Sequence, residues 1–177
     1  TTGTFNTLVG SLTGDALTTG GRHTLMGYAS GSSLIDPDRN VAFGYGSLQS
    51  DTKGTKSTAV GYSALNTQNF TSATDSFNTA VGYTAGESIT TGTFNTLVGS
   101  LTGDALTDAD SNVAIGYASL STDTLGSRSI AIGHGALNEQ NFTSATNTYN
   151  VAIGYAAGNA VTTGTENTLV GSLAGDA

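Results

Sequence analysis

The thirteen residues Asn6–Thr18 read NTLVGSLTGDALT, and the same letters return at Asn95–Thr107. A third copy begins at Asn167 as NTLVGSLAGDA and runs to the last residue. Internal repetition of this kind identifies architectures in which each unit packs mainly on its neighbours. The phrase therefore indicates an array of like units rather than one irregular domain.

Ten units fit a looser form of the phrase. Each begins with Asn, Ser or His, passes through a short segment rich in Val, Ile, Thr, Ala and Leu, and reaches Gly at its fifth position. The units begin at positions 6, 23, 40, 57, 78, 95, 112, 129, 150 and 167. Every fourth step is longer than the three before it, so four coils make one superperiod, as from Asn6 to Asn78. We number the positions of a coil from its first residue.

The unit length decides the fold class. Seventeen residues are too few for a pair of helices, and no window has apolar residues at helical spacing. Two short strands and two tight turns fill this length. We therefore predict an all-β protein, a parallel β-solenoid or β-roll of about ten 17-residue coils, two of them with four-residue insertions. Residues 1–177 are expected to form one array cut from a longer fibre, because they start and stop within a unit.

The apolar residues of the coils predict where the core lies. Position 4 is a bulky apolar residue in every unit, and we predict that it forms the core row. The row comprises Val9, Met26, Phe43, Val60, Val81, Val98, Ile115, Ile132, Ile153 and Val170. Position 5 is always Gly, as expected at a turn with positive φ or where another backbone comes close.

Two further pairs of positions vary together. Gly at position 9 accompanies an aliphatic residue at position 12, as in Gly103 and Leu106, whereas Leu at position 9 accompanies Asp, as in Leu48 and Asp51. Each coil is therefore expected to place one large aliphatic side chain in its second half. Leu at position 3 mostly accompanies Ser at position 6, and Ala accompanies Tyr or His. This second exchange predicts that positions 3 and 6 share one packing space.

Composition and charge narrow the function classes. The chain has 25 Gly, one Pro and no Cys, and 10% of its residues are charged, against about 25% in typical soluble proteins. The lack of Cys excludes disulfides and thiolate metal sites. A formal net charge of −8 argues against a phosphate-binding surface, so no nucleic-acid partner is expected. No apolar run reaches the roughly 18–20 residues of a membrane helix, so no membrane insertion is expected in this segment.

Two units carry a family resemblance. NTAVGYTAGESITTG (Asn78–Gly92) and NVAIGYAAGNAVTTG (Asn150–Gly164) resemble the NTAxGYxAL repeats of phage tail fibres and large bacterial surface proteins, which often end in a self-cleaving chaperone domain of the endosialidase type. They are also similar to the head repeats of trimeric autotransporter adhesins, whose period is shorter. The resemblance covers all ten units and implies an extracellular homotrimer, intertwined or side by side, in a virion tail fibre or a bacterial surface adhesin. A cell-surface glycan or receptor is the partner that it implies.

The sequence contains few groups suited to catalysis or metal binding. His134 stands where other units have Tyr, and His23 stands at the Asn or Ser start position, so both are expected to be structural. No catalytic set or cofactor motif is present, and we expect a structural protein, not an enzyme. Acid pairs offer weak candidates for Ca²⁺, although such pairs more often hydrogen-bond their own turns. These candidates are Asp36, Asp38, Asp108 and Asp110.

The two insertions are the best candidates for binding. Both keep QNFTSAT, within Asn66–Phe77 and Asn138–Tyr149. Loops on rigid scaffolds often carry binding, and amide, hydroxyl and aromatic groups together suit sugars. The candidate ligand-binding residues are Gln68, Asn69, Phe70, Thr71, Gln140, Asn141, Phe142 and Thr143. The alternative is a structural bulge whose Phe folds back onto the barrel.

The leading interpretation is a structural and adhesive fibre segment that spaces or presents receptor-binding parts. Ice binding is an alternative, because six coils have Thr at position 2, but the insertions are expected to break a flat face. A glycan-degrading tailspike needs paired carboxylates across a groove. The acids Asp15, Glu87 and Asp104 instead follow turns.

Overall fold

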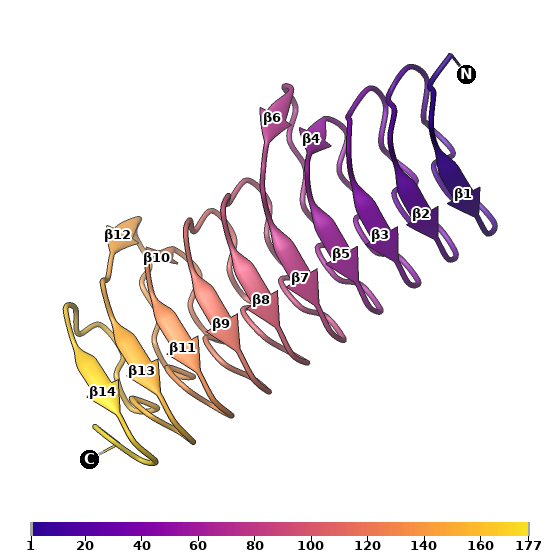
Figure 1. Ribbon diagram of the computed structural model, residues 1–177. Helices are drawn as coiled ribbons and strands as arrows, with labels where there is room; N and C mark the ends of the chain where they lie inside the picture. Colours follow the sequence, from indigo (N-terminus) through magenta and orange to yellow (C-terminus); the bar gives the residue numbers. More distant parts are fainter. Residues whose placement is uncertain (1, 177) are drawn as a thin grey trace.

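The computed structural model describes residues 2–176 of the chain. Short parallel strands stack side by side into a β-solenoid, with the two termini at opposite ends of the rod (Figure 1). The main sheet takes one strand from each coil, in the order β1 (Thr7–Val9), β2 (Thr24–Met26), β3 (Val41–Phe43), β5 (Thr58–Val60), β7 (Thr79–Val81), β8 (Thr96–Val98), β9 (Val113–Ile115), β11 (Ile130–Ile132), β13 (Val151–Ile153) and β14 (Thr168–Val170). The predicted all-β solenoid of 17-residue coils is confirmed.

The insertions leave this sheet unbroken. The pairing of β5 with β7 joins Thr58 to Thr79 across an insertion, in the same register as the pairs that no insertion separates. Each insertion instead contributes one strand of a small parallel pair with the coil before it, at the edge of the rod beyond the N-terminal ends of the main strands (Figure 1). These pairs are β4 (Gly54–Thr55) with β6 (Thr74–Asp75) and β10 (Gly126–Ser127) with β12 (Thr146–Asn147). The expectation that the insertions break a flat face is therefore wrong.

The predicted core row is also wrong, because position 4 faces outwards. Successive strand residues point to opposite faces of a sheet, and positions 1 and 3 take the inner face. Leu25 and Leu97 at position 3 are 0% exposed, whereas Val81 and Val98 at position 4 are each 36% exposed. The other members of the predicted row are likewise exposed or half-buried: Val9, Met26, Phe43, Val60, Ile115, Ile132, Ile153 and Val170.

A buried amide ladder explains why the polar position 1 faces inwards. The Asn95 side-chain Nδ2 donates to the carbonyl of Ala109 in its own coil at 2.7 Å, and its Oδ1 accepts from the backbone N–H of Asn112 in the next coil at 3.0 Å. Buried amides are tolerated when both ends are paired in this way. The same two bonds recur at Asn6, Asn40, Asn78, Asn112 and Asn150.

The second half of each coil is packed as the exchange of positions 9 and 12 predicts. A Cβ on Gly103 would lie 2.9 Å from both Leu106 and Leu97, so position 9 must be Gly when these two Leu residues occupy the space. Leu at position 3 therefore packs against Gly at position 9. The predicted pairing of position 3 with position 6 is wrong, because the position 6 side chains lie outside the core. Tyr83, for example, is 54% exposed.

The invariant Gly at position 5 meets both expected conditions. Gly99 has φ of 140°, and a Cβ there would lie 2.3 Å from the carbonyl oxygen of Gly116 in the next coil. A side chain at this position would therefore push neighbouring coils apart.

The ladder predicts a large and local cost for losing one amide. Asn95→Ala leaves the Ala109 carbonyl and the Asn112 N–H buried without their partner, and we expect it to lower the free energy of unfolding by about 2–4 kcal/mol. Asn159→Ala is the matched control, because this amide is half-buried outside the ladder, and it should change stability by less than about 0.5 kcal/mol. Urea unfolding measures both, and equal losses would contradict a structural role for the ladder.

Candidate functional site

Each insertion loop supplies an amide to the ladder in a coil that lacks Asn at position 1. Ser57 occupies position 1 of the fourth coil, and Gln68 from the insertion fills the gap. The Gln68 Nε2 donates to Ser57 Oγ at 2.9 Å and to Asp51 Oδ2 at 2.6 Å, while its Oε1 accepts from Asn78 Nδ2 at 2.9 Å. The second insertion repeats these contacts with Gln140, Ser129, Asp123 and Asn150.

Half of the predicted ligand-binding residues are therefore unable to touch a ligand. Gln68 and Gln140 are 0% exposed, and Phe70 and Phe142 are 6% and 7% exposed. For these four, the alternative of a structural bulge with its Phe folded inwards is confirmed. The other predicted residues differ. Asn69, Thr71 and Thr143 are exposed, and Asn141 is half-buried.

Asp51 and Asp123, each in the coil before an insertion, are residues of this site that sequence reasoning missed. Asp51 is 0% exposed, and its Oδ1 accepts the N–H groups of Gly54 at 2.9 Å and Phe70 at 3.1 Å. Burial raises the pKa of the Asp51 carboxyl, and these hydrogen bonds oppose the rise. A signal was present in the sequence, because Asp at position 12, Ser at position 1 and the insertion occur together once in each superperiod.

The four aspartates that were weak metal candidates pair with side chains of neighbouring turns and do not form a cluster. Asp38 lies 3.8 Å from Arg22 and 3.9 Å from Arg39. Hydroxyl groups of the preceding coil donate to the other three carboxylates: Thr18 and Thr19 to Asp36, Thr91 to Asp108, and Thr93 to Asp110. Within residues 2–176, no group of three or more His, Cys, Asp or Glu side chains is placed to hold a metal ion.

His23 replaces an amide of the ladder with an imidazole. Its Nε2–H donates to the carbonyl of Pro37 at 2.8 Å, and its Nδ1 accepts the N–H of Asn40 at 3.2 Å. The ring thus supplies one donor and one acceptor, as the Asn amide does. Only the neutral tautomer with its proton on Nε2 can make both hydrogen bonds. Burial lowers the pKa of His23, against smaller effects of its two hydrogen bonds and of the Asp38 charge.

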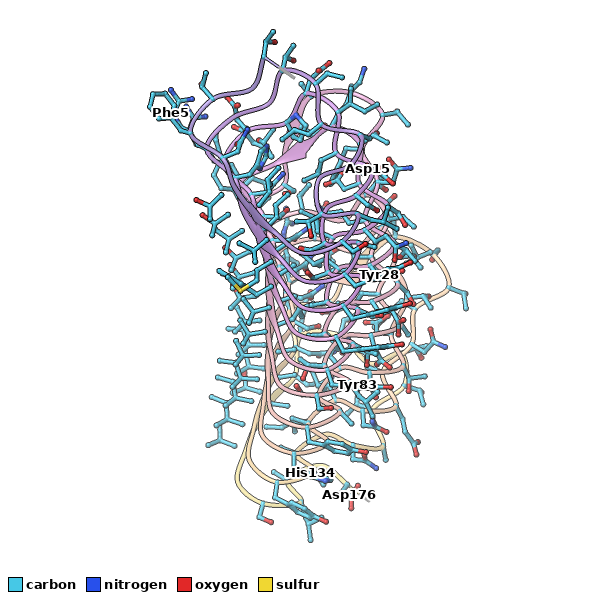
Figure 2. All side chains as sticks on the ribbon, turned by 90° about the vertical axis from the view of Figure 1, so that its right-hand side faces the viewer. Phe5, Asp15, Tyr28, Tyr83, His134 and Asp176 are labelled. Carbon is cyan, nitrogen blue, oxygen red and sulfur yellow. The ribbon has the colours of Figure 1, made fainter. Side chains whose placement is uncertain are left out.

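His134 belongs to an exposed aromatic row at position 6. Its ring centroid lies 5.1 Å from that of Tyr117 and 5.3 Å from that of Tyr155, in stacked arrangement, so the expected packing role is confirmed. Tyr28, Tyr83 and His134 follow one line along the rod (Figure 2). A hollow of about 380 Å³ lies beside the C-terminal part of this row, between its rings and the position 10 side chains of Asn138 and Asn159.

A second exposed row brings cations next to aromatic rings at the last position of the coils. Arg22 lies over Phe5 with its guanidinium carbon 5.8 Å from the ring centroid, and Lys56 lies over Phe77 at 4.9 Å. Arg128 lies over Tyr149 in the same way, at 5.7 Å. The row holds four of the five basic residues of the chain: Arg22, Arg39, Lys56 and Arg128. The sequence order alone does not reveal the row, because its members are a whole coil apart.

Comparison with protein-family models, curated proteins and solved structures found no match. In the described part of the chain, no helix has the length and apolar character needed to cross a membrane.

The lowered pKa of His23 predicts acid sensitivity. At pH values above 6.5, the ordinary pKa of histidine, His23 is neutral in both the folded and the unfolded chain. As the pH falls below that value, the unfolded chain takes up a proton that the buried ring resists, so this part of the stability is lost. Urea unfolding from about pH 7.5 to about pH 5 should show a steeper loss for the wild type than for His23→Asn. Parallel curves would contradict a lowered pKa of His23 in the folded chain.

Proposed function

We propose that the chain is a segment of a homotrimeric extracellular fibre, from a phage tail or a bacterial surface, that spaces or presents receptor-binding parts. The observation that carries this proposal is the outer face of the ten-stranded sheet. Positions 2 and 4 of every coil lie on this face, and none of their twenty residues is charged.

The face is long and apolar. Its position 4 row runs through ten coils at a spacing of about 4.8 Å, and its members include Val98, Ile115 and Ile153, which are 36–38% exposed. Contiguous apolar patches of this kind are uncommon on monomers and usually mark an interaction surface. A rod with such a face gains stability when the face is covered.

Copies of the same chain suit the face best. Because every coil presents the same small set of Thr, Val, Ile and similar side chains, a parallel copy in register meets equivalent residues along its whole length. No like charges meet at positions 2 and 4, even though the chain carries a net charge of −8. A closed three-fold arrangement covers the face on each chain without leaving an open contact.

Adhesion is assigned to the exposed residues of the rod. Asn69, Thr71 and Thr143 in the insertions remain accessible, and they are the place at which a cell-surface glycan or receptor contacts the segment. The proposal includes no catalytic step, no cofactor and no nucleic acid.

Ice binding is the second candidate. The observation in its favour is the unbroken register of the sheet across both insertions, which keeps the order of side chains on the face regular. Thermal hysteresis at high protein concentration would support it, and freezing without hysteresis would exclude it.

Sedimentation tests the trimer. The wild type should sediment as three chains of 17.7 kDa. Val98→Glu places a charge on the face at the centre of the rod and should release folded monomers, because each chain brings its own carboxylate into the apolar contact. Thr71→Glu, in an exposed insertion, is the control and should leave the trimer intact. A folded wild-type monomer at micromolar concentration would contradict the proposal.

A further inference from the structure

Two buried side-chain atoms of the described residues lack a hydrogen-bond partner: Thr84 Oγ1 and Asp104 Oδ1. Thr84 is position 7 of the fifth coil, and Asp104 is position 10 of the sixth. Buried polar groups are rarely left unpaired, and each such group calls for an explanation. Two of them in adjacent coils indicate one shared cause.

The repeat shows that positions 7 and 10 face each other. A Cβ on Gly46, at position 7 of the third coil, would lie 3.0 Å from Asn66 Nδ2 and 3.0 Å from Gln49 Oε1. Gln49 is position 10 of the same coil, and Asn66 is position 10 of the next. At Gly135, the same position in the eighth coil, a Cβ would have only Asn159 Oδ1 of the following coil nearby, at 3.9 Å. A side chain at position 7 is therefore directed at the position 10 side chain of the coil that follows, and in the third coil at that of its own coil as well.

In the fifth and sixth coils these places hold Thr84, Glu87 and Asp104. Thr84 is 5% exposed, so its side chain is enclosed, and by analogy with the third coil its Cβ lies on the side of the two carboxylates. Glu87 and Asp104 are half-buried. Desolvation, with a smaller contribution from the Glu87 charge, raises the pKa of the Asp104 carboxyl, which places both carboxylates in one electrostatic environment.

The position 10 side chain of the sixth coil differs in chemistry from that of the fourth and eighth coils. Asn66 Nδ2 donates to the carbonyl of Gly46 at 2.8 Å, and Asn138 Nδ2 donates to the carbonyl of Ala118 at 3.0 Å. In both cases an amide at position 10 satisfies a position 7 carbonyl of the preceding coil. Asp104 offers a carboxylate oxygen where these residues offer an N–H, and the Thr84 carbonyl instead accepts the backbone N–H of Glu87 at 3.2 Å. The Thr84 hydroxyl is able to donate to a carboxylate, yet neither it nor Asp104 Oδ1 has a hydrogen-bond partner, so the two do not bond directly. An ion placed between them would pair with both oxygens.

We propose that Thr84, Glu87 and Asp104 bind one hard divalent cation, with Ca²⁺ the best fit, between the fifth and sixth coils. An all-oxygen set of two carboxylates and a hydroxyl suits hard cations. Ca²⁺ accepts irregular geometry and fills its remaining positions with water, which reaches the half-exposed side, whereas Mg²⁺ demands a near-ideal octahedron. With so few protein ligands, the affinity should lie at about 10⁻⁴–10⁻³ M.

The superperiod supplies internal comparisons for this site. One superperiod later the equivalent places hold Ala156, Asn159 and Asp176, and one superperiod earlier they hold Leu12, Asp15 and Ser32. Neither set combines a position 7 hydroxyl with two carboxylates, so the site is expected once per chain. Thr84 also has φ of 51°, which is unfavourable for a β-branched residue. A hydroxyl bound to the ion would compensate for this cost.

Thermal unfolding and calorimetry with CaCl₂ test the site at constant ionic strength. We expect about 5 mM Ca²⁺ to raise the wild-type Tm by about 2–5 °C, with one ion bound per chain. Asp104→Asn should lose this response and be more stable than the wild type without Ca²⁺, because its amide donates to the Thr84 carbonyl as Asn66 does to Gly46. Thr84→Val keeps the β-branch and should weaken Ca²⁺ binding several-fold. Asp15→Asn, an exposed carboxylate at position 10, should respond like the wild type.

Three results would overturn the proposal. One is an unchanged wild-type Tm and no heat of binding with either Ca²⁺ or Mg²⁺. Another is an Asp104→Asn variant that still responds to Ca²⁺. The third is an equal loss of response in Asp15→Asn, which would indicate diffuse binding to a negatively charged surface. A Thr84→Val variant that is more stable than the wild type, together with no Ca²⁺ response in either, would assign the unpaired hydroxyl to packing alone.

Discussion

The buried amide at position 1 is the interaction on which the architecture depends. Each side chain closes its own coil through a carbonyl 14 residues on and holds the next coil through a backbone N–H, as Asn95 does with Ala109 and Asn112. Because a buried amide is costly when unpaired, any slip in register is penalised at every layer. The inward position of residue 1 then forces residue 3 inwards and residues 2 and 4 outwards.

The coils that lack Asn at position 1 still pair their buried polar groups there. His23 supplies an acceptor and a donor from one ring, and Ser57 is completed by Gln68, whose amide arrives from an insertion. The insertion is thus tied to a gap in the ladder, since Ser129 and Gln140 repeat the arrangement in the second copy. What varies at position 1 is the residue, and what is kept is the pattern of hydrogen bonds.

The repeat length, the parallel solenoid, the Gly at position 5 and the exchange of positions 9 and 12 could all be predicted, because they depend on spacing and volume. The core row could not be predicted, because position 4 carries the bulkier apolar side chain and position 3 often the smaller one, as with Val81 and Ala80. The ladder that determines which residues face inwards is formed between coils, so it is not visible in the sequence of one coil. The prediction that Gln68 and Phe70 bind a ligand is wrong for a related reason. Loop composition suggests binding, whereas their partners Asp51 and Ser57 become neighbours only after the chain has wound round.

The unchanged register across the insertions has a consequence for how such a rod can evolve. Duplication or deletion of one superperiod adds or removes four layers, about 19 Å of length, and leaves every surviving contact between layers of the same type as before. Length is therefore a modular property that recombination can adjust without new packing solutions. Surface chemistry can drift coil by coil in the meantime, provided that each inward-facing group keeps its partners.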